Sequence, residues 1–405
     1  MAEAMSMASP PPPERILMTV EPILAGLDTK FRLLESVGEG HSSVVRKAVE
    51  NATGATVAIK CIVKAHLDAL HWEALGREID FLRQLKHPHI ISLDSVYGDV
   101  DRFYLVTEYM AGGELFDRIV EQTYYGESEA RAILRHILDA LKCCHDHNIV
   151  HRDIKVCDNS SPYQPLILSK PENLFLQSAT DNTTLKLGDF GYAAFAPDDS
   201  SLTAPCGTPS YVAPEIIMHQ PYGKPVDIWS LGVVTFILLC GYQPFFGDTN
   251  IELFTRIRAG RFDCPDDLSA DAQDFLAKML AVDPAERYTI DQLANHIWLT
   301  SENGVTAPLT HTLEKLKQFN IRRKFKGAIR AVIASDIFRK ASHDASSVVE
   351  PEREPNNNEQ DLLHPKSSDR LNIDTTSTAL LTTHPTAPES ATRSWFRSMR
   401  ILPAG

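Results

Sequence analysis

Hydrophobic and polar residues follow two successive patterns along the chain. Between residues 31 and 107, segments such as "SSVVRKAV", "TVAIKCIV" and "FYLVTEY" are rich in β-branched and aromatic residues, which predicts strands. From residue 111 to 299, stretches such as "EARAILRHILDALKCCHDH" and "DAQDFLAKMLA" carry apolar residues at helical spacing. This order predicts an α+β fold with two lobes, a small β-rich N-lobe followed by a larger helical C-lobe.

The two ends of the chain have other patterns. Residues 1–30 begin with a proline run, which predicts a flexible arm. Within 300–340, a basic amphipathic pattern from about residue 309 predicts a helix. Residues 341–405 are rich in Ser, Thr, Asn and Pro and lack apolar periodicity, so we expect a disordered tail.

Charge is distributed unevenly. The net charge is -13, and residues 309–340 hold nine Lys or Arg against two acids, a net +7, which leaves about -20 for the rest. This acidic balance argues against general nucleic-acid binding. The longest apolar run, "IWSLGVVTFILLCG", is too short to span a bilayer, so no transmembrane segment is expected. Seven scattered cysteines indicate reduced thiols and favour a cytoplasmic protein.

The strand-rich part carries residues typical of phosphate binding. Gly38 and Gly40 lie between two strand segments, where backbone amides can approach phosphates, although a plain hairpin also fits. Lys60 ends the apolar stretch "TVAIK" and needs an anionic partner, because an isolated buried charge is costly. Glu78, on the helix predicted around "REIDFLRQL", is the candidate partner.

A set of motifs then follows in order: "HRDIK…PENLF", "LGDFG", "GTPSYVAPE", "DIWSLGVV" and "DPAERYT". On these motifs, residues 31–299 resemble a eukaryotic Ser/Thr protein kinase, most like the calmodulin-dependent group. The resemblance implies the bilobal protein-kinase fold, with ATP and Mg²⁺ as cofactors. It also implies transfer of the ATP γ-phosphate to hydroxyl groups of protein substrates.

The resemblance assigns roles to single residues. Lys60, oriented by Glu78, is expected to hold the α- and β-phosphates. Asp153 is expected to accept the substrate proton, and Lys155 to contact the γ-phosphate. The implied ATP-binding residues are Val37, Gly38, Glu39, Gly40, Val45, Ala58, Lys60, Glu108, Met110 and Glu114, and the implied metal ligands are Asn173 and Asp189.

Further positions follow from the same resemblance. Thr107 matches the gatekeeper that precedes the hinge at 108–110. Glu114 and Glu172 match acids that recognise an arginine in the substrate, which implies substrates with basic motifs. Glu215 and Arg287 match a buried ion pair of the large lobe.

The cluster His145, His147 and His151 also suggests a zinc site. No Cys or acid completes a ligand set there, and the kinase motif accounts for His151. A zinc site is therefore not expected.

Fifteen extra residues, 156–170, interrupt the motif between Lys155 and Pro171. Closing a loop of this length costs about 2.4 kcal/mol plus a constant, so we expect the fold to survive. Activity is more sensitive, because a misplacement of about 1 Å in a catalytic constellation lowers the rate roughly a hundredfold. A catalytically silent scaffold that binds nucleotide and calmodulin is therefore an alternative.

The insertion itself is either family-specific or a retained in-frame intron, since Val codons begin with GT and a Lys codon ends with AG.

The basic segment resembles the autoinhibitory and calmodulin-binding segment of the multifunctional calmodulin-dependent kinases. Ile329, Ile333 and Phe338 have the spacing of a 1-5-10 anchor set, and Phe325 shares a helical face with two of them. Such a helix suits the groove of calcium-loaded calmodulin. A membrane-surface helix is the alternative, and the basic-aromatic end "RSWFRSMRIL" also leaves membrane recruitment open.

Two threonines are candidate regulatory sites. Thr203, in the segment expected to face Arg152, suits phosphorylation by an upstream kinase. Thr312 lies where the family's autonomy-conferring threonine is found, although Leu309 replaces the arginine three residues before it. No association domain follows, so we expect a monomer.

Overall fold

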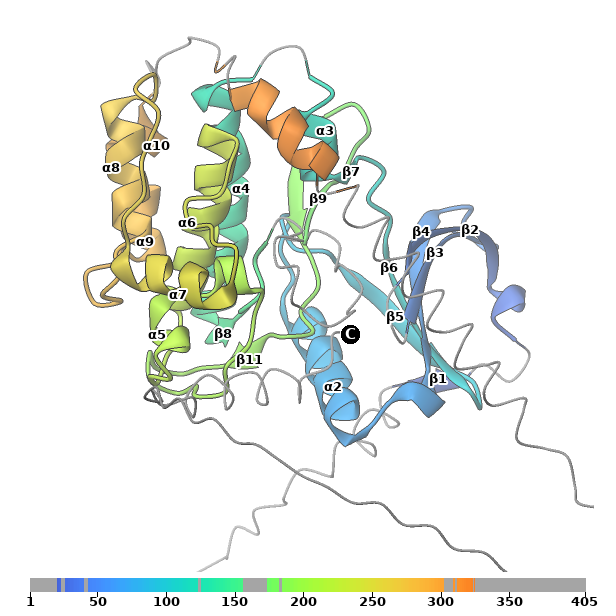
Figure 1. Ribbon diagram of the computed structural model, residues 1–405. Coiled ribbons are helices and arrows are strands. Elements are labelled where there is room, and N and C mark those ends of the chain that lie inside the picture. Colours follow the sequence, from blue (N-terminus) through green and yellow to red (C-terminus); the bar gives the residue numbers. More distant parts are fainter. Residues whose placement is uncertain are drawn as a thin grey trace, which may run out of the picture.

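The chain folds into a small lobe built on a β-sheet and a larger lobe that is mostly helical (Figure 1). The α+β bilobal fold predicted from the motifs is therefore confirmed. This computed structural model describes residues 20–22, 26–39, 43–122, 125–155, 173–181, 184–301, 309, 312–322 and 324. Among these residues, no helix has both the length and the apolar character needed to cross a membrane.

The small lobe is a six-stranded sheet in the order β1-β5-β6-β4-β3-β2. All neighbouring strands are antiparallel except β1 and β5. Ala48, Ile59 and Val106, from three adjacent strands, are buried together on one face, as the alternation of strand side chains requires. The elements are β1 (Glu21–Pro22), β2 (Phe31–Glu39), β3 (Ser43–Glu50), β4 (Thr56–Val63), α2 (Ala69–Gln84), β5 (Leu93–Gly98) and β6 (Arg102–Glu108), with 3-10 helices at Leu27–Thr29 and Lys64–His66.

The flexible arm predicted for residues 1–30 is wrong at its C-terminal end. Strand β1 pairs with Tyr97 and Gly98 of β5, and Leu27 is buried against Phe31 and Tyr97. Val20 also packs on the core. These apolar residues cover sheet surface that would otherwise face water, which is why this part of the arm is held. Residues 1–19 lie outside the described part.

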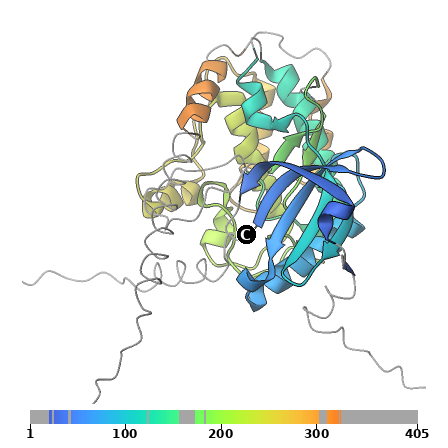
Figure 2. The same cartoon turned by 90° about the vertical axis from the view of Figure 1, so that its right-hand side faces the viewer.

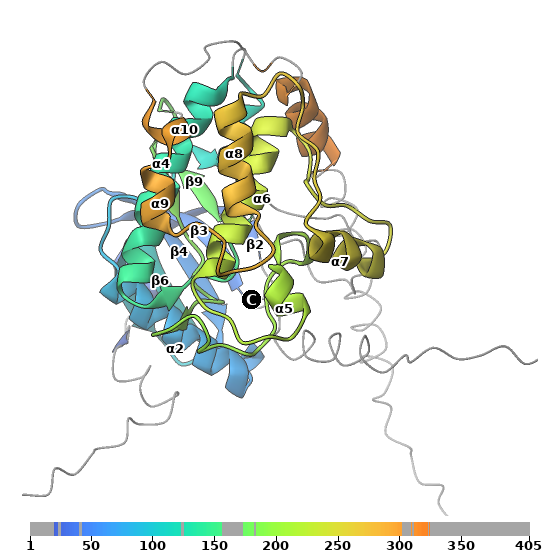
Figure 3. The same cartoon turned by 90° about the vertical axis from the view of Figure 1, so that its left-hand side faces the viewer.

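The large lobe is organised around α6 (Pro225–Cys240), in which every residue from Val226 to Cys240 is buried. A helix that is apolar on all sides belongs in a core, and α6 packs against α4 and α8 (Figure 3). Gly241, with φ of 78°, ends the helix in the left-handed conformation. The other elements are β7 (Gly113–Glu114), α3 (Leu115–Ile119), α4 (Glu127–Asp146), β8 (Ile149–Val150), β9 (Leu174–Leu176), β10 (Leu185–Leu187), β11 (Ala194–Phe195), a 3-10 helix (Pro209–Tyr211), α5 (Pro214–Ile217), α7 (Asn250–Ala259), α8 (Ala270–Met279), α9 (Ile290–Ala294) and α10 (Ile297–Thr300).

A last helix, over 312–322, packs on the large lobe; it is the orange helix beside α3 in Figure 1 and the orange helix at the upper left of Figure 2. Leu313 and Leu316 are buried in the core of the lobe. Thr312 donates a hydrogen bond from Oγ1 to the backbone oxygen of Leu239 at 2.8 Å. The basic helix predicted from residue 309 is thus observed over its first part, docked on the protein.

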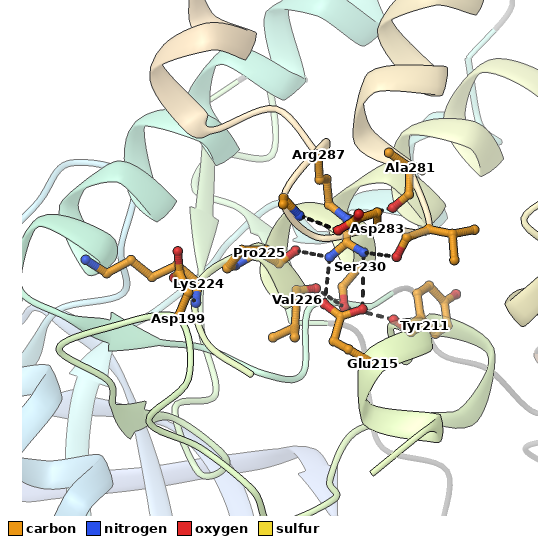
Figure 4. Close-up of polar contacts among 12 residues, drawn as sticks. Asp199, Tyr211, Glu215, Lys224, Pro225, Val226, Ser230, Ala281, Asp283 and Arg287 are labelled. Atoms are coloured by element: carbon orange, nitrogen blue, oxygen red, sulfur yellow. Dashed lines mark hydrogen bonds and ion pairs between the residues drawn. The ribbon is translucent and has the colours of Figure 1, made fainter. Parts of the chain in front are cut away.

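A buried ion pair joins two distant parts of this lobe (Figure 4). Arg287 donates two hydrogen bonds to the carboxylate of Glu215, at 2.8 and 3.2 Å. Its guanidinium also donates to the backbone oxygens of Pro225 and Ala281, so most of its donors are satisfied. The pairing of Glu215 with Arg287 predicted from the sequence is present.

We expect Arg287→Ala to lower the free energy of unfolding by about 3–5 kcal/mol, because it leaves a buried carboxylate without its partner. The control is Arg256→Ala, which removes a pair with Glu252 in which both side chains are 41% exposed. That change should cost about 1 kcal/mol or less. Urea unfolding measures both, and equal losses in the two variants would contradict this account.

Candidate active site

Lys60 and Glu78 meet between the sheet and α2. The Nζ of Lys60 lies 2.8 Å from one carboxylate oxygen of Glu78 and 3.1 Å from the other. Burial acts to lower the pKa of Lys60, but the carboxylates of Glu78 and Asp189 outweigh it and raise that pKa. The lysine is therefore held as a cation, which suits binding of phosphate groups.

Asp227 of α6 anchors the loop at residues 151–155, which contains Asp153 and is called the catalytic loop below. The Asp227 carboxylate accepts hydrogen bonds from the backbone N–H groups of His151 and Arg152, both at 2.8 Å, and contacts His145 Nε2 at 2.9 Å. Burial acts to raise the pKa of Asp227, but these donors, His145 foremost, lower it. The carboxylate form of Asp227 is thus favoured, and it fixes the backbone of residues 151 and 152, with Arg152 at a φ of 66°.

Asp153 is 3% exposed and is held by three neighbouring side chains. Lys155 Nζ lies 2.6 Å from one carboxylate oxygen, and the hydroxyl of Thr208 donates to the other at 3.1 Å. The Asn173 side chain donates from Nδ2 to the backbone oxygen of Asp153 at 2.6 Å. Asn173 is therefore in contact with Asp153 although twenty residues separate them in sequence.

Asn173 also faces the start of the next motif. Its backbone oxygen accepts a hydrogen bond from the N–H of Gly188 at 2.9 Å, immediately before Asp189. The side-chain Oδ1 of Asn173 is buried and has no hydrogen-bond partner among the described residues. Buried oxygens normally have partners, so this oxygen is suited to a ligand. With the Asp189 carboxylate, it provides the oxygen donors that Mg²⁺ prefers.

The predicted nucleotide-binding residues lie on the strands and hinge above this site. Val45 of β3 pairs with both Gly38 and Lys60, and Ala58 pairs with Thr107. Met110 is half-buried after β6, and Glu114 ends β7 before α3. Val37 is exposed on β2, and Glu39 is the last residue of β2. Gly40 lies outside the described residues.

The side chain of Glu108 is already engaged within the protein. One carboxylate oxygen lies 2.8 Å from Lys186 Nζ and accepts from the N–H of Ser92 at 2.8 Å. Its backbone remains a candidate contact to the nucleotide. The sequence did not reveal Lys186 or the role of Asp227, although an acid inside an otherwise apolar helix was a usable signal.

The regulatory threonines differ in environment. Thr203 is exposed in the segment between β11 and α5. Arg152 donates to Tyr192 O and Tyr222 Oη in this structure. Thr312 is 2% exposed, so in this conformation its hydroxyl is closed to another enzyme. The predicted calmodulin anchors Phe325, Ile329, Ile333 and Phe338, the acid Glu172, and the insertion 156–170 lie outside the described residues.

The three histidines that were considered as zinc ligands contact separate partners. His145 contacts Asp227, His147 contacts the backbone oxygen of Cys143 at 2.8 Å, and His151 contacts that of Gly188 at 3.1 Å. Within the described ranges, no cluster of three metal-binding side chains is found.

Comparison with known proteins agrees with this geometry. The protein kinase domain family matches residues 31–159 and 168–299, and the break in the match lies inside the predicted insertion. The chain is 38% identical over 308 residues, 74% of its length, to the delta subunit of calcium/calmodulin-dependent protein kinase type II from Oryctolagus cuniculus. The matched part is 55% of that protein, so the chain spans about half of this relative. The match over more than half of its length shows that this chain belongs to the protein kinase family.

Proposed function

We propose that the chain is a cytoplasmic protein serine/threonine kinase that transfers the γ-phosphate of ATP to substrates with basic motifs. One observation carries the proposal: Asn173 Nδ2 donates to the backbone of Asp153 at 2.6 Å, across the insertion. This contact supports the proposal, because it keeps the proposed base and one proposed metal ligand together across the insertion. Nothing in the described site favours the silent scaffold.

In the proposed mechanism, Lys60 binds the α- and β-phosphates with Glu78 holding its orientation. Asp153 accepts the proton of the substrate hydroxyl, with its carboxylate kept in place by Lys155 and Thr208. Lys155 also neutralises charge on the transferred phosphate. Asn173 and Asp189 would hold Mg²⁺, which neutralises and orients the phosphates when bound.

We expect Asn173→Ala to lower peptide phosphorylation by at least about a hundredfold, since it removes one preorganised group of the site. It also removes Oδ1, the oxygen proposed to bind the metal, so the Mg²⁺ concentration needed for half-maximal rate should rise. Asn250→Ala is the control, because Asn250 is a buried asparagine on α7 that is not among the proposed site residues. An unchanged rate and Mg²⁺ dependence in Asn173→Ala would refute the assignment.

The insertion itself can be tested by deleting 156–170. The deletion joins Lys155 to Pro171 and leaves every proposed site residue in place. Because Asp153 and Asn173 already touch, we expect the intact and shortened chains to differ in turnover by less than about tenfold. Phosphorylation of a basic peptide measures both forms. If only the shortened form is active, the chain that contains residues 156–170 is the silent scaffold.

We further propose that the segment beyond residue 309 holds the kinase inactive until calcium-loaded calmodulin binds it. The docked helix supports this, because Leu313 and Leu316 are buried against the large lobe. Asp117 of α3 accepts from Asn320 and pairs with Lys324, each at 3.1 Å. The segment's net +7 against about -20 elsewhere also favours docking, and salt weakens this attraction. Calmodulin would compete for the same segment, so the two equilibria are linked.

Phosphorylation would add a second control. We propose Thr203 as the acceptor for an upstream kinase, because it is exposed and Arg152 donates to the hydroxyl of Tyr222, whose backbone pairs with that of Leu202 beside Thr203. Thr312 remains a proposed site only for the undocked helix, since docking buries its hydroxyl.

The calmodulin proposal predicts a specific loss for Ile333→Asp. The charge would enter an apolar groove, so the calmodulin concentration for half-maximal activation should rise at least about 30-fold. Ile321→Asp is the matched control, because Ile321 is 67% exposed and outside the proposed anchors. Phosphorylation is measured against calmodulin, with calcium or with a chelator. A full-length chain that is equally active in chelator would exclude autoinhibition.

A further inference from the structure

Two cysteines from distant segments meet at the C-terminal end of α6. Cys240, the last residue of the helix, is buried, and Cys264 is half-buried in the segment between α7 and α8. The pKa of each thiol is shifted chiefly by a side-chain hydrogen bond with the other thiol. The two sulfur atoms are therefore neighbours in the folded chain, although α7 lies between them in sequence.

The segments that carry the two thiols are fixed to each other by two contacts near the pair. Tyr242 donates a hydrogen bond from its hydroxyl to the backbone oxygen of Asp263 at 3.1 Å. The rings of Phe236 and Phe262 pack edge to face with centroids 5.7 Å apart. Contacts within four residues of Cys240 and within two residues of Cys264 thus hold the two segments together.

The two thiols have unequal chemistry. The hydrogen bond from Cys240 lowers the pKa of Cys264, although burial opposes this. The same hydrogen bond, together with burial, raises the pKa of Cys240. Cys264 is also the one that solvent reaches. A thiol with a lowered pKa and solvent access is the one that reacts first with an oxidant.

We propose that Cys240 and Cys264 form a redox-active dithiol that a hydroperoxide converts into an intramolecular disulfide. The Cys264 thiolate attacks the peroxide, the O–O bond breaks, and a sulfenic acid and hydroxide form; the hydroxide takes a proton and leaves as water. The Cys240 sulfur then attacks the sulfur of Cys264, and the displaced hydroxide leaves as water with the Cys240 proton. Two thiols and one hydrogen peroxide give one disulfide and two waters.

The disulfide would lie beneath the docked helix. Gly241, next to Cys240, is so close to this helix that an added Cβ would lie 2.6 Å from the Cβ of Lys315. Lys315 Nζ also lies over the ring of Tyr242, 4.9 Å from its centroid. The bond would close a loop that contains α7, and cross-links of this kind stabilise the folded state by restricting the unfolded chain.

The test treats the full-length chain with hydrogen peroxide and follows its intact mass and tryptic peptides. We expect a loss of two hydrogen atoms and a cross-linked peptide pair containing Cys240 and Cys264, both reversed by a reductant. The melting temperature should rise by about 5 °C on oxidation. Cys264→Ser should abolish the mass loss and the thermal shift. Cys143→Ser, which removes another half-buried thiol, should change neither.

Cys240→Ser provides a second variant, in which Cys264 should stop at a sulfenic acid that a dimedone probe captures. Oxidation of wild-type Cys264 to sulfinic acid without a cross-link would overturn the proposal. A disulfide from Cys264 to another cysteine, including Cys157 of the insertion, would overturn it as well.

Discussion

The catalytic side of the molecule depends on one buried carboxylate. Asp227 belongs to α6, the helix at the centre of the large lobe, and it binds the backbone of the loop through His151 and Arg152. The loop is thereby attached to the most deeply buried element of the protein. This attachment lies upstream of the insertion, so it holds Asp153 in place whatever path the chain takes before Asn173. From Asn173 onward, the chain is held by β9 and β10 instead.

The chemistry of the site was largely predictable from sequence, because it follows from local motifs. A lysine at the end of an apolar strand requires an acid, and Glu78 is that acid in the structure. The buried pair of Glu215 and Arg287 was expected from the resemblance of the motifs to a known family, and the two side chains do pair. The contact of Asn173 with Asp153 was beyond sequence reasoning, because the length of an insertion does not say where its two ends are held.

Other features depended on tertiary packing and escaped the sequence. Val20 and Leu27 are isolated apolar residues without periodicity, so nothing distinguished them from the proline-rich arm until the sheet surface beneath them was seen. Thr312 reads as an accessible phosphate acceptor, yet the first turn of its helix packs on the end of α6 and buries it. Glu108 was placed in the hinge from sequence, but the contact of its side chain with Lys186 of β10 was not foreseen. Each of these features depends on a contact between residues that are far apart in sequence.

The short strand β1 has a consequence for the sheet as a whole. Without it, β5 would be an edge strand, with unpaired backbone groups available to another copy of the chain. Glu21 and Pro22 occupy part of that edge opposite Tyr97 and Gly98, and the proline offers no N–H on which a further strand could build. The family match begins at residue 31, after this strand. A fragment cut at the family boundary would therefore carry an uncovered edge, and its tendency to self-associate would reflect the cut and not the protein.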